Sequence, residues 1–446
     1  MTEGTSYSKG NMNRSIRSLA LTAIIFAIGS AALQAQTVTA LHNFTGGRDG
    51  ANPMAGLSTD ARGNLYGTAA EGGSGYGTVF KLGRQGSGWI FIPLYAFAGR
   101  PSDGANPRAR VVFGPNQTLY GTTLHGGGDC SNGGCGTVFN LQPPPTVCVT
   151  ALCPWRETVL LSFDGNGGSL PYSEVTFDSS GNMFGTTQYG DGLPAGGGPC
   201  EPPDCGVVYE LSPSNGGWIE STPYQFEDGN FGQPGGFPVA GVTFDGAGNL
   251  YGVAGGYFRF GNIYKLTPPG DDPPWTYQDL YDFDNGGGAG PLANMILDAS
   301  GTFYGDTAGL APGYGDQFGS VFSFAPNGEG GWTLTNLHTF PTLGGGPSAQ
   351  LLEDSVGNLY GTTVTGGINP NGNCVAAGCG TIFELSPSVG SWTFTVLWQF
   401  TGGADGAAPY SNLIMDADGN FYGTASAGGS SSNCTGGCGV IFKFTP

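Results

Sequence analysis

The sequence predicts an all-β protein that folds as a seven-bladed β-propeller with four-stranded blades. Three observations lead to this prediction: a short motif recurs seven times, each repeat divides into four β-type segments, and the two ends of the repeat array complement each other. Glycine supplies 85 of the 446 residues. It falls at fixed offsets from aromatic residues, unlike the glycine of a disordered tract.

The recurring motif is an asparagine or threonine, two hydrophobic residues, a glycine and, in most copies, a threonine, as in NLYGT. Its aromatic residues are 53 to 67 residues apart, which is a repeat period. The length differences between copies fall in predicted loops. The aromatic residues of the motif are Tyr66, Tyr120, Phe184, Tyr251, Tyr304, Tyr360 and Tyr422.

Each repeat contains four short runs of β-forming residues separated by turn residues. Residues 332–385 show them as WTLTNLHTF, AQLLEDSVGN, LYGTT and GTIFEL. Helical periodicity is absent. Four-stranded blades around a channel match this arrangement. A parallel β-helix is the alternative, but its coils are shorter and more uniform.

The ends of the array predict how the ring closes. Residues 37–44 read as an outer strand, and residues 439–446 read as the strand that precedes an outer strand in the repeat. We therefore expect the N-terminal segment to pair beside residues 439–444 and complete the last blade. Such closure removes exposed strand edges that would otherwise invite aggregation.

A tryptophan stands eight residues before a phenylalanine in six outer segments, and Gln36 takes its place before Phe44. Residues eight apart on a regular strand face the same side. We predict that both rings pack between blades, with a stacking platform for sugars as the alternative. The pairs are Trp89 and Phe97, Trp155 and Phe163, Trp218 and Phe226, Trp275 and Phe283, Trp332 and Phe340, and Trp392 and Phe400.

The first 35 residues read as a signal peptide. Arg14 and Arg17 precede an apolar run at residues 19–33, and Ala35 is a small residue suited to cleavage. The alternative is a membrane anchor, but about 15 apolar residues are fewer than the roughly 20 that span a bilayer. Residues 36–446 then form a single propeller domain of seven repeats, without membrane insertion after cleavage.

The mature chain is strongly acidic. Without residues 1–35 it has 11 basic and 32 acidic residues, a formal net charge of −21. Such a surface repels phosphate backbones and anionic lipids, so we expect no nucleic-acid partner.

Ten cysteines form five close pairs, which in an exported protein predicts disulfides. Zinc is the alternative, but three histidines in the whole chain supply no set of four ligands at the usual spacing. The predicted pairs are Cys130 with Cys135, Cys148 with Cys153, Cys200 with Cys205, Cys374 with Cys379, and Cys434 with Cys438.

Four of these pairs fall in the loop that follows the motif strand, and the second cysteine directly precedes the next strand's first glycine. In the other three repeats that position holds Tyr76, Phe260 and Phe318. We expect a covalent clip or a packed ring to close this loop. Each clip contributes about 2 kcal/mol in the loop-entropy model.

An acidic loop follows six of the outer segments, and its aspartates are predicted to ring one mouth of the channel. They suit calcium or polyol hydroxyls, because both favour hard oxygen ligands. The alternative is a simple Asp-Gly turn. No other cofactor is expected, and the copy at residues 342–344 lacks the acid. The candidate ligand-binding residues are Asp49, Asp103, Asp164, Asp228, Asp284 and Asp405.

No motif assigns a catalytic residue. The sequence has no nucleophile elbow, no H-E-x-x-H and no phosphate-binding G-x-x-x-x-G-K. An Asp-x-x-Gly turn precedes the motif, as at Asp60. It is comparable to the Asp-box turn of sialidases but is one residue longer. We expect these aspartates to cap their own turns.

GNLYGTT, a glycine-rich loop and GTVFxL, recurring every 50 to 70 residues, resemble the GloVer (Gloeo/Verruco) tandem repeat of bacterial exported proteins. The resemblance covers residue 37 to the end and implies export without an assigned activity. Many members carry a C-terminal sorting segment, whereas the sequence ends at Phe444-Thr445-Pro446. We therefore expect a secreted or periplasmic protein.

These features favour a monomeric, non-catalytic protein that acts in extracellular binding or as a scaffold, with a polysaccharide or another protein as ligand. The alternative is a carbohydrate-active enzyme, a hydrolase or lyase with two carboxylates near the channel mouth. A third reading is a durable envelope component.

Overall fold

The computed structural model divides the chain into Met1–Ala35 and Gln36–Pro446. The division coincides with the predicted cleavage site, and the signal peptide itself stays a prediction. The structure describes residues 1–2, 4, 36–99, 101–128, 130, 133–144, 155–165, 167–190, 205–226, 236–255, 260–270, 274–283, 290–309, 318–343, 345–367, 374 and 378–446. Within these ranges no helix has the length and hydrophobicity to span a bilayer.

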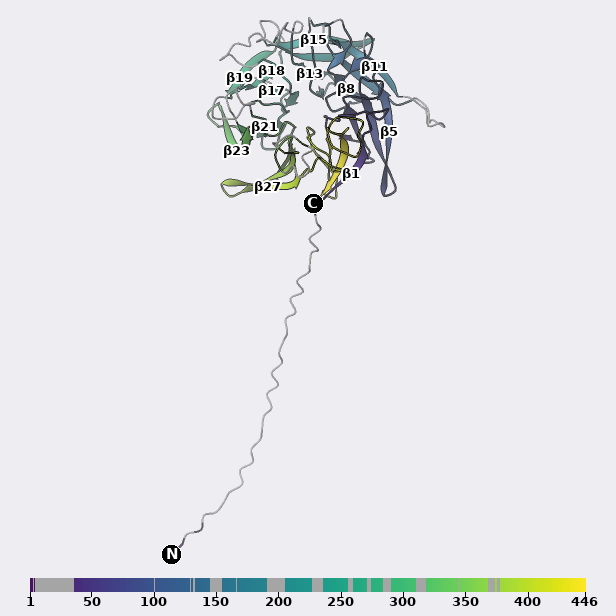
Figure 1. The fold of residues 1–446 in the computed structure, drawn as a ribbon. Coiled ribbons are helices and arrows are strands. Elements are labelled where there is room, and N and C mark those ends of the chain that lie inside the picture. Colours follow the sequence, from purple (N-terminus) through teal and green to yellow (C-terminus); the bar gives the residue numbers. More distant parts are fainter. Residues whose placement is uncertain are drawn as a thin grey trace. The chain divides into compact units, whose positions relative to one another are not determined.

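Residues 36–446 form seven antiparallel sheets of four strands each, which confirms the predicted seven-bladed β-propeller. Figure 1 shows the blades in a ring, with outer strands such as β5, β15 and β23 at the periphery. In each blade the innermost strand is two or three residues long, and the motif strand comes second. The first three blades comprise β2 (Ser58–Thr59), β3 (Leu65–Ala69), β4 (Thr78–Gln85) and β5 (Gly88–Ala96); β7 (Val112–Phe113), β8 (Leu119–Thr123), β10 (Thr137–Gln142) and β11 (Arg156–Ser162); and β12 (Thr176–Phe177), β13 (Met183–Thr187), β14 (Val207–Ser214) and β15 (Gly217–Gln225).

The next three blades repeat this order, and a small additional sheet pairs β6 (Gly104–Ala105) with β9 (His125–Gly126). Blades 4 to 6 comprise β16 (Val242–Phe244), β17 (Leu250–Ala254), β18 (Asn262–Thr267) and β19 (Thr276–Asp282); β20 (Ile296–Leu297), β21 (Phe303–Thr307), β22 (Phe318–Pro326) and β23 (Trp332–Leu343); and β24 (Leu352–Glu353), β25 (Leu359–Thr363), β26 (Thr381–Ser388) and β27 (Ser391–Gln399).

The seventh blade joins the two ends of the propeller domain, as predicted. It contains β28 (Ile414–Met415), β29 (Phe421–Ala425) and β30 (Val440–Thr445), and β1 (Thr37–Asn43) is its outer strand. β1 runs antiparallel to β30, from Thr37 opposite Thr445 to Asn43 opposite Val440. The ring is therefore closed by backbone pairing between the first and last strands.

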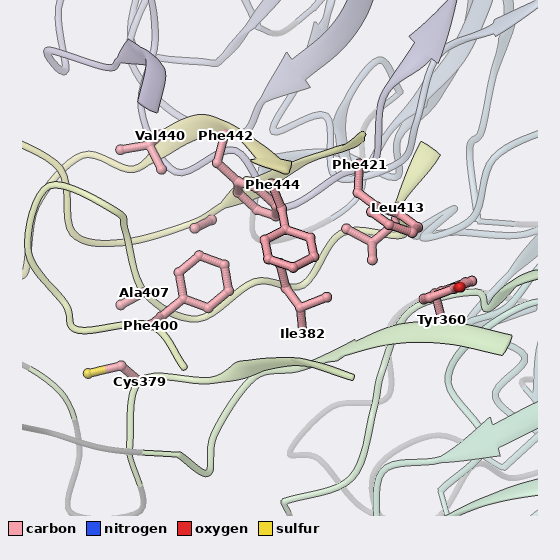
Figure 2. Packing of buried hydrophobic residues seen from close by; sticks show 11 residues of the cluster. Tyr360, Cys379, Ile382, Phe400, Ala407, Leu413, Phe421, Val440, Phe442 and Phe444 are labelled. Carbon is pink, nitrogen blue, oxygen red and sulfur yellow. The ribbon is translucent and has the colours of Figure 1, made fainter. Parts of the chain in front are cut away.

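The hydrophobic core consists of layers between adjacent blades. Figure 2 shows the layer between blades 6 and 7, where Phe400, Phe421 and Phe444 pack together and Cys379 lies at one edge. The predicted packing of the outer-strand aromatics between blades is confirmed: Trp155, for example, contacts Tyr66 of the preceding blade at a ring separation of 6.4 Å.

The expectation that each tryptophan faces the same side as its phenylalanine is wrong. Trp89 packs in the layer toward blade 7, whereas Phe97 packs in the layer toward blade 2. The reason is a β-bulge, since the register shifts between Val79 and Phe80 and leaves Leu94 without a partner. One extra residue reverses the facing of every later side chain. Each outer strand therefore contributes to both of its neighbouring layers.

The threonine of the motif links consecutive blades. Its hydroxyl donates to a backbone carbonyl of the following blade, which joins two sheets that share no strand pairing. The bonds run from Thr68 to Ala109 (3.0 Å), Thr122 to Ser173 (2.9 Å), Thr186 to Ala240 (2.8 Å), Thr362 to Ser411 (3.0 Å) and Thr424 to Ala55 (2.8 Å).

Candidate functional site

Two sets of loops meet at one end of the propeller, which we call the mouth. The loop after an outer strand pairs with the loop after the next blade's motif strand, as at Ala51 with Glu71 and Ala407 with Ala427. The β6–β9 sheet is the same contact in longer form. Where the structure describes them, the loops of the mouth are therefore bonded to one another.

The position that alternates between cysteine and aromatic residues lies where blades join. The backbone carbonyl at this position accepts a hydrogen bond from an amide of the following loop, and the residue that donates has a positive φ. Tyr76 accepts from Asn106 (2.8 Å) and Cys379 from Ala408 (2.9 Å), so the two are equivalent in backbone role. Their side chains differ in burial, because Tyr76 is 47 % exposed and Cys379 is 1 % exposed.

Three predicted disulfides are confirmed: Cys130–Cys135, Cys374–Cys379 and Cys434–Cys438. Cys205 is also disulfide-bonded. Its predicted partner Cys200, and the predicted pair Cys148 and Cys153, lie outside the described residues.

Three of the predicted ligand-binding aspartates serve their own loops. Asp103 is 6 % exposed and accepts hydrogen bonds from Tyr95 Oη (2.9 Å) and the Ala98 amide (2.7 Å). Asp49 is hydrogen-bonded to the His42 side chain and the Thr45 amide, and Asp405 to the Trp398 side chain and the Thr401 amide. In all three loops the aspartate thus bonds to one side chain of the outer strand and one amide of the loop. These contacts match the turn interpretation, and ligand binding by these residues stays a prediction.

Of the remaining aspartates, the structure describes only Asp164. Asp164 directly follows Phe163 and is exposed, so it is not equivalent to Asp49, Asp103 or Asp405. Asp228 and Asp284 lie outside the described residues. Within the described ranges no three His, Cys, Asp or Glu side chains cluster as metal ligands, and calcium binding stays a prediction.

The Asp-x-x-Gly turns cap themselves, as expected. Asp60 Oδ1 accepts hydrogen bonds from the amides of Arg62 (2.9 Å) and Asn64 (3.0 Å). Burial acts to raise the pKa of Asp60, but the bonds from Asn64 and Arg62 outweigh it and hold the pKa below its ordinary value. The carboxylate is thus part of the turn structure.

The channel is lined by seven equivalent four-residue stretches, which we call the channel segments. Each lies directly before or at the start of an innermost strand, and its second residue is an alanine or serine, whose carbonyl in five of the seven segments accepts the hydrogen bond from the preceding blade's threonine. The lined cavity has a volume of about 100 Å³. None of the described candidate aspartates is among its lining residues. The channel segments are residues 54–57, 108–111, 172–175, 239–242, 292–295, 348–351 and 410–413.

The third positions of the channel segments form a polar cluster. Arg110 Nη2 donates to Glu174 Oε1 at 2.7 Å, and Asn294 Nδ2 approaches the same oxygen at 3.3 Å. Asn294 Oδ1 accepts from the Gly241 amide. Arg110 Nε is buried without a partner among the described residues.

Two channel segments have glycine at their third position, and each glycine leaves room for the asparagine side chain of another segment. A Cβ at Gly56 would overlap the Asn412 side chain, and one at Gly241 would lie 3.0 Å from Asn294 Nδ2. The amides therefore occupy space that a side chain would fill.

The first positions lie nearer the mouth by chain order, and three of them are an arginine and two tyrosines that line one cavity. The Arg108 guanidinium lies 5.8 Å from the Tyr172 ring centre, and Nε donates to Asn106 Oδ1 at 2.8 Å. Tyr410 lines the same cavity as Arg108, and burial raises the pKa of Tyr410 while the Arg108 charge opposes the rise. Two half-buried tyrosines and one arginine thus share the mouth of the channel.

Sequence reasoning missed the channel segments, although a signal was present. The pattern P-x-[AS]-x-[LVM] begins at Pro53 and recurs in every repeat, and the variable x positions are those that line the channel. The acidic loops were the predicted site because they share an aspartate, which can bind a ligand. The channel positions share no residue type, so they gave no comparable signal.

Comparisons with known proteins place the chain by sequence and by fold. The family model described as the Gloeobacter/Verrucomicrobia repeat matches residues 22–198, 192–375 and 313–446. No curated protein matches the sequence.

Solved structures match at low identity. A candidate 6-phosphogluconolactonase from Bacteroides uniformis is 14 % identical with a TM-score of 0.49, covering 87 % of this chain and 99 % of that chain. A candidate oxidoreductase (glucose dehydrogenase) from Thermus thermophilus is 14 % identical with a TM-score of 0.42, over 92 % and 100 %. A gluconolactonase from Xanthomonas campestris is 13 % identical with a TM-score of 0.40, over 93 % and 92 %.

Proposed function

We propose that this chain, which belongs to the Gloeobacter/Verrucomicrobia repeat family, is an exported, non-catalytic binding protein that takes a polysaccharide ligand at the mouth of its channel. The observation that carries the proposal is the group of Arg108, Tyr172 and Tyr410 at that mouth. Tyrosine rings offer an apolar face with a polar tip, and guanidinium offers a planar set of donors, which together suit a hydroxyl-rich ring.

The cavity size supports end-on binding. Its volume of about 100 Å³ is below the roughly 300–1,000 Å³ of sites that enclose a whole small molecule. The channel would therefore receive the end of a chain, while the bonded mouth loops present a broad surface to the rest.

The carboxylates around the channel favour binding over glycoside hydrolysis. Glu174 is the one acidic residue among the described lining residues, and it is engaged by Arg110 and Asn294. Glycosidases need two carboxyl groups facing one bond, one of them free to transfer a proton. A protein ligand is the other class that a ring of fixed loops would suit.

The disulfides at the mouth support an exported protein. Disulfides persist in oxidising compartments, and the three described pairs all fix mouth loops. A secreted or periplasmic location follows as part of the proposal.

A glycan array with and without calcium tests the proposal. We expect binding to a limited set of glycans, and at least about tenfold weaker binding after Tyr172→Ala or Tyr410→Ala, since a tenfold change is about 1.4 kcal/mol. Tyr76→Ala is the matched control, because Tyr76 lies at the mouth but not in the channel lining. Silence across the array in both conditions would overturn the carbohydrate assignment.

A further inference from the structure

Blade 2 alone supplies cations to the channel. Its channel segment carries Arg108 and Arg110 at the first and third positions, and the other six segments have no lysine or arginine there. Because all seven segments build the same backbone arrangement, these two charges are not required to form a blade. The mature chain has 11 basic residues, so two at one cavity are a marked concentration.

The charges in the channel do not cancel. Arg110 is paired with Glu174 at 2.7 Å. Arg108 has no carboxylate partner among the described residues, and its recorded contacts are Asn106 Oδ1 and the Tyr172 ring. One positive charge thus stays uncompensated in a half-buried position, within a domain whose net charge is −21.

An uncompensated, partly desolvated guanidinium favours an anionic ligand. Arginine presents parallel N–H donors that match the two oxygens of a carboxylate, and charge-assisted hydrogen bonds are about twice as strong as neutral ones. Arg110 Nε adds a buried donor without a partner among the described residues. Both arginines come from one channel segment, two residues apart, so they follow one wall of the channel.

We propose that the channel site recognises a carboxylate group on a terminal sugar residue, held by Arg108 at the mouth, with the sugar ring against Tyr172 and Tyr410. This inference rests on the proposed function and names the ligand's chemical class. The cavity of about 100 Å³ is below the roughly 300–1,000 Å³ of sites that enclose a whole small molecule, which fits entry of a carboxylate and a few neighbouring atoms.

The charge of the whole domain narrows the ligand further. A net charge of −21 repels polyanions at long range, whereas the field of a single half-buried guanidinium acts at contact. The ligand is therefore a neutral chain with one acidic end, or a free sugar acid, rather than a polyuronate.

The test compares matched ligands by calorimetry. The probes are a neutral oligosaccharide, the same oligosaccharide ending in glucuronic acid, its uronamide, and free glucuronate. We expect the acid-ended chain to bind at least tenfold tighter than the neutral chain and the uronamide. Free glucuronate separates a requirement for the chain from recognition of the acid alone.

Arg108→Gln should abolish the preference for the acid-ended chain over the neutral chain and the uronamide, and Arg108→Lys should retain part of that preference. Arg156→Gln is the control, because Arg156 is an exposed residue of β11 outside the channel lining and its loss changes the net charge equally. Thermal unfolding of each variant checks that it is folded.

The outcomes separate the two proposals. Equal binding of acidic and neutral chains overturns the carboxylate inference and leaves the binding function standing. A preference that survives Arg108→Gln overturns it as well. Binding of none of the probes, with an array that is silent for all glycans, overturns both.

Discussion

At residue 306 an aspartate stands where five other blades have the linking threonine of the motif. Asp306 is 2 % exposed, and neither carboxyl oxygen has a partner among the described residues. Burial raises the pKa of Asp306 well above its ordinary value. Blade 4 has Val253 at this position, so two of the seven blades lack the linking threonine.

Asp306→Thr should therefore stabilise the protein. The hydroxyl can donate to the next blade as in the other copies, and an unpaired buried group is removed, which together are worth about 1–3 kcal/mol. Because the folded-state pKa is raised, the wild type loses stability as pH rises, and the advantage of the variant should grow from pH 4 to pH 8. Thermal unfolding at both pH values measures it.

Asp306→Val is the matched control, since it reproduces blade 4 and removes the carboxyl group without adding a donor. We expect a smaller gain than with threonine. A wild type that is more stable than both variants at pH 8 would show that the carboxylate is stabilised in place.

Glu157 is a second carboxyl group with a raised pKa. Burial is the larger cause and the Asp103 charge adds to it, which raises the pKa of Glu157 to about 7. Its Oε1 has no partner among the described residues. Protonation is therefore favoured by folding, so this group destabilises the protein progressively between about pH 4.5 and pH 7.

Glu157→Gln should leave stability unchanged at pH 4 and raise it at pH 8. The expected gain is about 1 kcal/mol, discounted because the side chain is partly exposed to solvent. Denaturant unfolding at the two pH values measures the difference. An equal effect at both would mean that packing, not charge, is responsible.

At the scale of elements, the glycine before the third strand of a blade makes room for a proline of the next repeat. Gly77 has φ +97°, and a Cβ there would lie 2.5 Å from Cδ of Pro107, which directly precedes the next channel segment. Gly439 and Pro53 repeat the contact across the ring closure, with φ +92° and 2.5 Å. The glycine and the proline of consecutive repeats are thus one structural unit.

The disulfide clips act at the same junction. Cys438 is 1 % exposed, and its carbonyl accepts from the Asn52 amide at 2.9 Å. Cys434→Ala with Cys438→Ala should lower the free energy of unfolding by about 2 kcal/mol, because the closed loop is short. Calorimetric unfolding measures this, and an unchanged midpoint would show that the hydrogen bond to Asn52 alone fixes the loop.

At the scale of the whole molecule, stability depends on closing the ring. β1 pairs with β30 over six residue pairs, and Val38 and Ala40 pack against the layer of blades 6 and 7. Without β1 the last blade would expose β30 as an edge.

A chain that begins at Thr45 should therefore be less stable by several kcal/mol, from lost burial and strand pairing, and should aggregate. A chain that begins at Gln36 is the control and should match the full chain. Thermal unfolding and size-exclusion chromatography measure both. A peptide of residues 36–44 added in trans should restore stability by strand addition, and a truncated chain as stable as the control would refute the closure.

The sequence predicted the candidate site less well than it predicted the fold. Asp49, Asp103 and Asp405 recur, and in the structure each supplies the same acceptor to its own loop. Arg108 and Tyr172 stand at positions where the repeats differ, so the recurring pattern carried no signal for them.

The sequence by itself determined the number of blades, their four strands, the closing strand and the disulfide partners that the structure describes. It could do so because each is a local pattern, or a pairing of neighbours in the chain, repeated seven times. Tertiary structure alone decided that the bulge at Leu94 turns Trp89 and Phe97 to opposite layers, that the Arg108 guanidinium lies beside the Tyr172 ring, and that Tyr410 lines the same cavity. Arg108 and Tyr410 are far apart in the chain, and only the closed ring brings them to one cavity.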